Sequence, residues 1–241
     1  MTIKKFLTIT LVALFCVCGG KSMAYDFSFT YQGKTLYYDI TSSTTVKVTF
    51  KSRGGDDFVN YINGDIVIPA KVSYMNKNYT VTAIGRSAFE DCSRLTSVKI
   101  EAPITYIGED AFEGCSRLKS INLPNSVISI GESAFSDCIA LKSITIPTVI
   151  TVIREGTFSD CRSLTSIEIP ATVTSIGEDA FEGCNRLKSI YSKNPNPPAI
   201  DDETFEGVSR KAVVYVPTNS VSKYKQSAGW LRFANIEGKK F

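Results

Sequence analysis

The residue types that carry catalysis in most enzymes are sparse in this sequence. It contains no histidine, which excludes the usual Ser–His and Cys–His nucleophile pairs, the commonest general base, and zinc motifs built on histidine. Gly33-Lys34-Thr35 has the ending of a phosphate-binding loop, but Ser28 stands where that loop requires its first glycine. The surrounding residues indicate a hairpin turn, so the phosphate-loop motif fails.

Five evenly spaced cysteines are the most regular set of reactive side chains. In a stack of repeats, equivalent side chains lie about 5 Å apart and point the same way, whereas a disulfide needs Cβ atoms near 4 Å with facing vectors. Collinear thiolates also cannot surround a tetrahedral zinc ion, and Val208 takes the cysteine phase in the last repeat. The spacing favours reduced, buried thiols that act as small apolar side chains over disulfide or redox use, at Cys92, Cys115, Cys138, Cys161 and Cys184.

Paired carboxylates are the remaining candidates for acid–base chemistry. Each pair stands where a turn enters an expected helical segment, and acids at that place stabilise the first turn of a helix. We therefore expect capping roles, with a carboxylate-based enzyme as a minor alternative. The acids are Glu109-Asp110, Glu178-Asp179 and Asp201-Asp202-Glu203.

A 23-residue repeat has to position all of these side chains. The phrase Ile-Gly-Glu-Asp-Ala-Phe-Glu-Gly-Cys that begins at Ile107 returns in altered copies, and its phenylalanine arrives one residue late in the last copy. A fixed period in this range is typical of a solenoid, because a unit this short buries its apolar side only against its neighbours. The phenylalanines are Phe89, Phe112, Phe135, Phe158, Phe181 and Phe205.

Within each repeat, three segments differ in their periodicity. Ser97-Val98-Lys99-Ile100 alternates polar and apolar residues, which predicts a half-buried strand whose copies pair side by side in one parallel sheet. A second apolar pair, such as Val127 and Ile130, follows on the opposite side of the coil, and the segment before each cysteine predicts a short helical turn. Arg154 replaces the usual glycine of that segment; if the glycine holds a positive φ, Arg154 is strained or the turn is shifted.

The two ends differ from the repeat and predict caps. Before the repeats, β-branched and aromatic runs bounded by turn residues predict an antiparallel hairpin sheet. After them, Thr218 to Ala228 predicts a short helix that ends at Gly229, with Trp230 and Phe233 as apolar cover. The expected divisions are a signal peptide over 1–24, an N-terminal β cap over 25–63, the solenoid over 64–217 with a hairpin inserted near 70–81, and a C-terminal cap over 218–241.

The first 24 residues have the layout of a secretory signal peptide. Lys4 and Lys5 precede an apolar run that is too short to span a bilayer, and Ser22-Met23-Ala24 supplies small residues for cleavage near Ala24. A retained N-terminal anchor is the alternative. Three of the 27 basic residues and none of the 24 acidic ones lie in this segment, so the remainder lacks the basic excess of a nucleic-acid binder. We expect a secreted, periplasmic or cell-surface protein without a transmembrane segment.

The repeat resembles a known family. Ala-Phe-x-x-Cys-x-x-Leu-x-Ser-Ile-x-Ile-Pro, with Val-x-x-Ile-Gly between copies, is similar to the BspA-like leucine-rich repeat of bacterial cell-surface proteins. Residues 78–85 and 224–230 resemble the flanks of that family. The resemblance implies a leucine-rich-repeat solenoid and a secreted or surface-displayed binding protein without a catalytic site or cofactor; some relatives adhere to host matrix proteins such as fibronectin and fibrinogen. Fold alone does not name the ligand.

The outward side chains of the expected strands form the part of the surface that can be identified from the sequence. These outward residues differ in nearly every repeat, whereas the inward residues stay the same in type. The variable outward positions indicate either a binding face or ordinary solvated sheet. Tyr191 and Tyr215 take equivalent phases on successive strands, with Glu168 and then Thr145 further along. Their rings should lie about 5 Å apart, beside the proline-rich loop 194–198. We expect these four residues to bind a protein or glycan in a monomeric, non-enzymatic adhesion module, the alternative being a structural spacer or self-assembling surface component.

Overall fold

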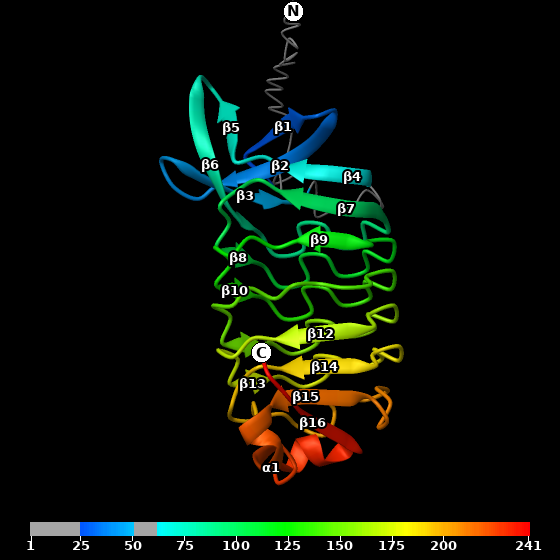
Figure 1. Cartoon of the computed structure of the whole chain (residues 1–241). Coiled ribbons are helices and arrows are strands. Elements are labelled where there is room, and N and C mark those ends of the chain that lie inside the picture. Colours follow the sequence, from blue (N-terminus) through cyan, green and yellow to red (C-terminus); the bar gives the residue numbers. More distant parts are fainter. Residues whose placement is uncertain (1–24, 51–61) are drawn as a thin grey trace, which may run out of the picture.

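A stack of short coils makes up residues 25–50 and 62–241, the part of the chain that the computed structural model describes (Figure 1). Each coil is one turn of the solenoid and contributes one rung to each of two strand ladders. The expected signal peptide, its cleavage point at Ala24 and the residues 51–61 of the expected N-terminal cap lie outside the described residues.

The first ladder carries the copies of the alternating phrase. Its strands pair in parallel as β4-β7-β9 and as β12-β14-β15-β16, so that one face of each strand points into the coil and the other to solvent. The strands are β4 (Asn63–Ile68), β7 (Arg94–Ile100), β9 (Ser120–Asn122), β12 (Ser166–Ile169), β14 (Ser189–Ser192), β15 (Val213–Pro217) and β16 (Asn235–Lys239).

The second ladder lies on the other side of the coils, as Figure 1 shows for β8 and β10. It is parallel throughout, and short rungs of two residues are enough because neighbouring coils continue the hydrogen bonding in the turns. Its strands are β3 (Thr45–Thr49), β6 (Lys77–Ile84), β8 (Tyr106–Ile107), β10 (Ser129–Ile130), β11 (Val152–Ile153) and β13 (Ser175–Ile176).

An antiparallel sheet closes the N-terminal end, as predicted. β1 (Phe27–Tyr31) pairs with β2 (Lys34–Ile40), β2 pairs with β3, and β3 then joins the second ladder by pairing in parallel with β6. A further hairpin projects from the same end, where β5 (Lys71–Tyr74) pairs with β6 through a turn whose two central residues hold positive φ. The N-terminal strands are therefore continuous with the solenoid.

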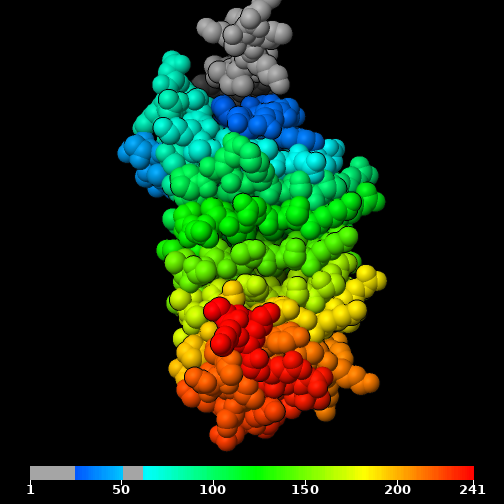
Figure 2. Space-filling view, in the orientation of Figure 1, coloured from blue at the N-terminus to red at the C-terminus, as the bar shows by residue number. Residues whose placement is uncertain are grey.

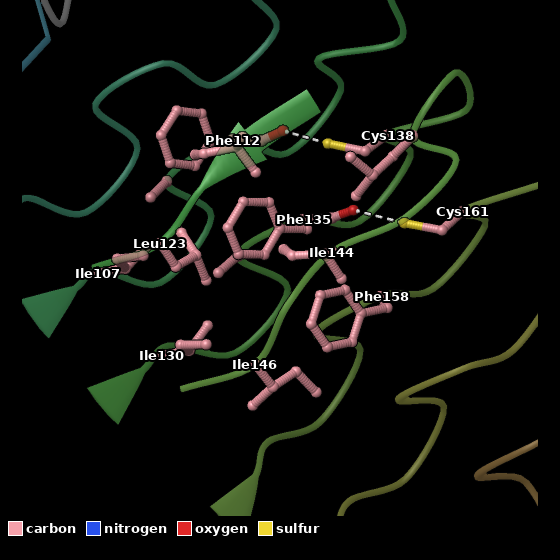
Figure 3. Packing of buried hydrophobic residues seen from close by; sticks show 14 of the residues in the cluster. Ile107, Phe112, Leu123, Ile130, Phe135, Cys138, Ile144, Ile146, Phe158 and Cys161 are labelled. Atoms are coloured by element: carbon pink, nitrogen blue, oxygen red, sulfur yellow. Dashed lines mark hydrogen bonds between the residues drawn. The ribbon is translucent and has the colours of Figure 1, made fainter. Parts of the chain in front are cut away.

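A column of phenylalanines forms the core between the two ladders. All six rings, from Phe89 to Phe205, are fully buried, and successive rings stack with centroids 5.1 to 5.7 Å apart. Isoleucines and leucines from both ladders surround the column, among them Ile107, Leu123 and Ile130 in Figure 3. Each ring thus has a ring above and below, and no unit buries its own.

Four of the cysteine thiols donate a hydrogen bond to the preceding coil. The thiol of Cys138 donates to the carbonyl oxygen of Phe112 at 3.3 Å, and that of Cys161 donates to Phe135 at 3.3 Å (Figure 3). The same carbonyl of Phe112 also accepts the backbone N–H of Cys115, three residues along. The repeated cysteine is therefore a buried donor as well as a small apolar side chain.

The predicted helical turn around each phenylalanine is wrong: the segment is a run of tight turns. Asp110 and Gly114 flank Phe112 with positive φ, which a helix does not allow. The N–H of Phe112 donates to Ala134 in the next coil, and that of Phe89 donates to Ala111. Because these donors bond between coils, they are not free to form the bonds of a helix.

The expected continuous sheet is interrupted at one place, which we call the seam. The copy of the strand phrase at Ser143–Ile146 forms no strand and joins the first ladder only by a bridge between Thr145 and Glu168. In the second ladder, β10 and β11 belong to separate sheets. Both breaks separate the coil of Phe135 from the coil of Phe158, whose rings have the widest spacing in the column, 5.7 Å.

The residue Arg154 accounts for the seam. At the same phase, Gly108, Gly131 and Gly177 have no positive φ; instead, a Cβ there would lie 2.3 to 2.6 Å from a backbone nitrogen of the preceding coil. Each of these glycines donates its N–H to an isoleucine of that coil, and the described residues show no such bond from Arg154. A side chain at this phase therefore holds two coils apart.

The C-terminal end is closed by short helical segments and a strand. The predicted short C-terminal helix is present, but it is divided into the 3-10 helix η2 (Thr218–Ser220), the α-helix α1 (Val221–Tyr224) and the 3-10 helix η3 (Ala228–Arg232), which continues through Gly229. Trp230 is fully buried and donates its indole N–H to the carbonyl of Pro198 at 2.9 Å. The strand β16, which the sequence did not predict, then returns to the first ladder.

The glycine phase gives a direct test of the inter-coil contact. Gly131→Ala should lower the free energy of unfolding by about 2 kcal/mol, because its Cβ would lie 2.3 Å from the nitrogen of Glu109. Arg154→Ala, at the same phase of the next coil, should change it little. Urea denaturation followed by circular dichroism measures both, and equal losses would contradict the proposed cause of the seam.

Candidate binding surface on the first ladder

Five outward side chains form one row across the C-terminal part of the first ladder. Strand register places Glu168 beside Tyr191, Tyr191 beside Tyr215, and Tyr215 beside Glu237. Thr145 extends the row on the far side of Glu168 through the isolated bridge. The structure therefore brings together all four residues that the sequence suggested and adds Glu237.

The two tyrosines of this row form a stacked pair, which we call the tyrosine pair. The ring centroids of Tyr191 and Tyr215 lie 4.9 Å apart and the ring planes differ by 12°, which confirms the predicted adjacency. Both residues are half-buried. The pair is a rigid aromatic surface with hydroxyl groups at its rim.

A lysine from β16 covers this pair. The Nζ atom of Lys239 lies 4.5 Å from the ring centroid of Tyr191 and 5.3 Å from that of Tyr215. Figures 1 and 2 show the C-terminal end of the chain, in red, lying over the coils of β14 and β15. Sequence reasoning missed Lys239, since Ile236 is the only buried residue of β16 and one apolar residue is a weak strand signal.

Charged groups flank the tyrosine pair on both sides. The carboxylate of Glu168 accepts a hydrogen bond from Lys193 at 2.6 Å, and the same ammonium lies 5.9 Å from the ring of Phe241. Glu237 forms no ion pair within the described ranges. The surface therefore combines aromatic faces with carboxylates at both ends of the row.

The proline-rich loop 194–198 makes its contacts with the C-terminal helical segments. The carbonyl of Asn194 accepts from Tyr224, that of Pro195 from Ser220, and that of Pro198 from Trp230. Its side chain at Asn194 is buried and donates to Val173. The loop thus anchors the cap, and Lys239 is the side chain that lies over the tyrosines.

The acidic groups singled out as possible catalysts lie in separate turns. Asp201 accepts hydrogen bonds from the backbone and hydroxyl of Thr204, which is a capping role. Glu109 and Asp110 contact Arg86 at 2.7 and 3.5 Å. Over 25–50 and 62–241, no three cysteine, aspartate or glutamate side chains are grouped to hold a metal ion. These acids serve turns and surface pairs.

Among the described residues, Glu113 is the one carboxyl whose pKa moves close to neutrality. Burial, followed by the neighbouring charges of Asp110 and Glu90, raises its pKa from 4.5 to about 7, and it shares a hydrogen bond with Asp110. Between pH 4.5 and 7 the folded chain therefore binds more protons at Glu113 than the unfolded chain does. The charged form destabilises the fold above pH 7, and this loss disappears as the pH falls towards 4.5.

A pH series on a neutral variant tests this sign. Glu113→Gln should raise the free energy of unfolding at pH 8, by up to about 1 kcal/mol because water still screens this partly solvated group, and should give no gain at pH 5. Glu182→Gln is the control, since Glu182 occupies the same phase and accepts a hydrogen bond from Ser159. Thermal melts at both pH values measure the effect. A gain that is equal at both pH values would contradict it.

The thiols are chemically protected by the same burial that packs them. Burial raises the pKa of Cys92 and Cys184 to about 12 and raises the pKa of the other three well above the ordinary value of a thiol. All five are free and buried. Thiolate, the reactive form, is therefore scarce at neutral pH.

Alkylation tests the state of the cysteine column. Iodoacetamide at pH 8 should leave Cys92, Cys115, Cys138, Cys161 and Cys184 unmodified in the native chain and should label all five in denaturant. Intact mass spectrometry gives the number of adducts. A native mass two or four hydrogens below that of the reduced chain would instead identify disulfides.

The repeats of this chain are similar to those of a known protein family. Residues 82–222, more than half of the chain, match the BspA type leucine rich repeat region in six copies. No curated protein matches the chain. No helix in the described part of the chain is long and apolar enough to cross a membrane.

Several solved structures are similar to this chain. A leucine rich repeat protein of T. pallidum superimposes with a TM-score of 0.58 and 25% identity over 75% of this chain and 78% of that one. A leucine rich cell surface protein of Faecalibacterium prausnitzii gives 0.46 and 24% over 81% and 72%. A leucine-rich repeat protein of Bacteroides ovatus gives 0.34 and 20% over 89% and 77%.

Proposed function

The chain belongs to the BspA-type leucine-rich repeat family, and we propose that it is an exported, non-enzymatic module that recognises a protein or glycan through the first ladder. The site is centred on Tyr191 and Tyr215, with Glu168 and Thr145 beside them. The leader-like first 24 residues support export to the cell surface, the periplasm or the medium.

One observation carries this proposal: the outward row of the first ladder contains a stacked, half-buried aromatic pair near its C-terminal end. Inward residues of the ladder are nearly all isoleucine, leucine or valine and are buried, whereas outward positions change from Lys99 to Asn122 to Glu168 and then to the tyrosine pair. Packing constrains the first set and not the second. The outward set is therefore the part of the coil that is free to specify a partner.

The tyrosine pair has the properties of an interface anchor. Tyrosine combines a large apolar face with a polar rim and is enriched among residues that dominate binding energy. Stacking at 4.9 Å fixes both rings, so little side-chain entropy remains to be lost on binding. A cell-surface or host extracellular matrix protein is the partner class that a surface-displayed family member suggests.

The alternative function is a structural spacer whose molecules stack end to end. The covered C-terminus of the solenoid argues against it. Trp230 and Phe233 are buried there, and Trp230 is held by Pro198. End-to-end stacking needs an apolar or unpaired surface at the last coil, and the short helical segments cover that coil. Carboxylate-based catalysis would require converging acids, and the candidate acids occupy separate turns.

Capture of partners by two matched variants tests the proposed site. The double change Tyr191→Ala and Tyr215→Ala should weaken binding of a retained matrix protein or surface glycan by about 2 kcal/mol or more, because both anchors are lost. Asn122→Ala, an exposed position on the same ladder, should change it little, and neither variant should unfold. Surface plasmon resonance measures the affinities. Equal losses from both variants, or no loss from the tyrosine change, would place the site elsewhere, first on the hairpin around Tyr74 and Tyr79.

A further inference from the structure

The tyrosine pair has a carboxylate on each side of it in the row. Glu168, Tyr191, Tyr215 and Glu237 occupy consecutive rungs in register. Neighbouring strands lie about 4.8 Å apart, so each carboxylate is one rung from a ring. Lys193 pairs with Glu168, whereas Glu237 has no ion pair within the described residues. Aromatic faces carry a partial negative charge, so the rings and Glu237 together favour a positive group.

The chain already places a cation on this row. The ammonium of Lys239 lies 4.5 and 5.3 Å from the two ring centroids, both within the distance at which a cation over a ring face is attracted to it. Lys239 forms no ion pair within the described residues, so the rings are its evident electrostatic partner. The geometry of a bound cation is thus present in the free chain.

We propose that the tyrosine pair is a cation-recognition site which takes an arginine or lysine side chain of a protein partner in place of Lys239. This inference rests on the proposed function and narrows it from protein or glycan to a basic protein segment. A neutral sugar would stack on the rings and could donate hydroxyl hydrogen bonds to Glu237, but it has no positive charge to replace that of Lys239 over the rings. Arginine suits two stacked rings best, because its planar guanidinium lies flat on an aromatic face.

Lys239 can leave the rings without unfolding its strand. Its side chain is exposed, and the backbone of β16 stays paired with β15 along its whole length, from Asn235 to Lys239. Rotation of one solvent-exposed side chain is therefore sufficient to open the site. The same reasoning makes Lys239→Met a mild change, since it removes the charge and keeps the stem.

Two labelled peptides that differ only in charge test the proposal. One carries a single central arginine among neutral residues, and its twin carries citrulline, the uncharged isostere of arginine. Fluorescence anisotropy gives the affinity of each for the folded chain. The Lys239→Met variant should bind the arginine peptide about tenfold more tightly than the unaltered chain, because the competing ammonium is gone, and about tenfold more tightly than it binds the citrulline twin.

Matched variants distinguish binding at the tyrosine pair from a general effect of surface charge. Lys99→Met removes one exposed positive charge from the far end of the same ladder and should leave the affinity for the arginine peptide unchanged. In the Lys239→Met chain, Tyr191→Phe with Tyr215→Phe should keep the gain, since the ring faces remain. Tyr191→Ala with Tyr215→Ala should abolish it. Circular dichroism confirms that each variant is folded.

The outcomes are distinct from those of the partner-capture experiment. Equal binding of the arginine and citrulline peptides, or no difference between Lys239→Met and Lys99→Met, would overturn cation recognition. If the tyrosine variant still loses its captured partner in that case, the binding surface stands and only its charge preference is wrong. If the alanine variant of the pair retains both the captured partner and the arginine peptide, both proposals fall.

Discussion

The architecture depends on a match between two distances. Phenylalanine rings in the core stack with centroids 5.1 to 5.7 Å apart, and hydrogen-bonded strands lie about 4.8 Å apart. Because the two spacings are similar, one ring and one strand of each ladder fit within the spacing between coils. Four of the five cysteine thiols, those from Cys115 to Cys184, therefore reach the phenylalanine carbonyl of the preceding coil. The ring column, the two ladders and the thiol bonds therefore stabilise one another.

The seam shows the effect of a wider spacing between two neighbouring coils. Arg154 keeps its coil from the close backbone contact that glycine allows at Gly131 and Gly177. Both ladders lose their pairing at this level, yet the turns keep theirs, since Phe135 still donates to Thr157 across the gap. The core column tolerates the wider spacing because stacking of rings falls off more gradually than a hydrogen bond does. The distance between neighbouring coils is thus set by the backbone contact at the glycine phase of the repeat, and the column of rings tolerates a change in that distance.

Sequence reasoning predicted what periodicity controls. The recurrence of phenylalanine fixed the solenoid, and the shared phase of Tyr191 and Tyr215 was enough to predict their contact. It failed where bonding between coils decides the outcome, as in the turns around Phe112, whose donors bond to the next coil instead of forming a helix. It also missed β16 and Lys239, because a strand with one buried residue, Ile236, is specified by the edge it joins more than by its own sequence.

The position of the candidate site follows from the way the ladder ends. The tyrosine pair lies on the last strands before β16, where an uncovered aromatic face at the end of a sheet would favour non-specific association. A lysine over both rings covers that face with a hydrated charge while leaving the rings in place. Only a group that competes with an ammonium for the same rings gains access, so the feature that protects the surface also selects its ligand. On the proposed cation recognition, a single contact between Lys239 and the tyrosine pair both covers the aromatic face of the free chain and favours a basic partner.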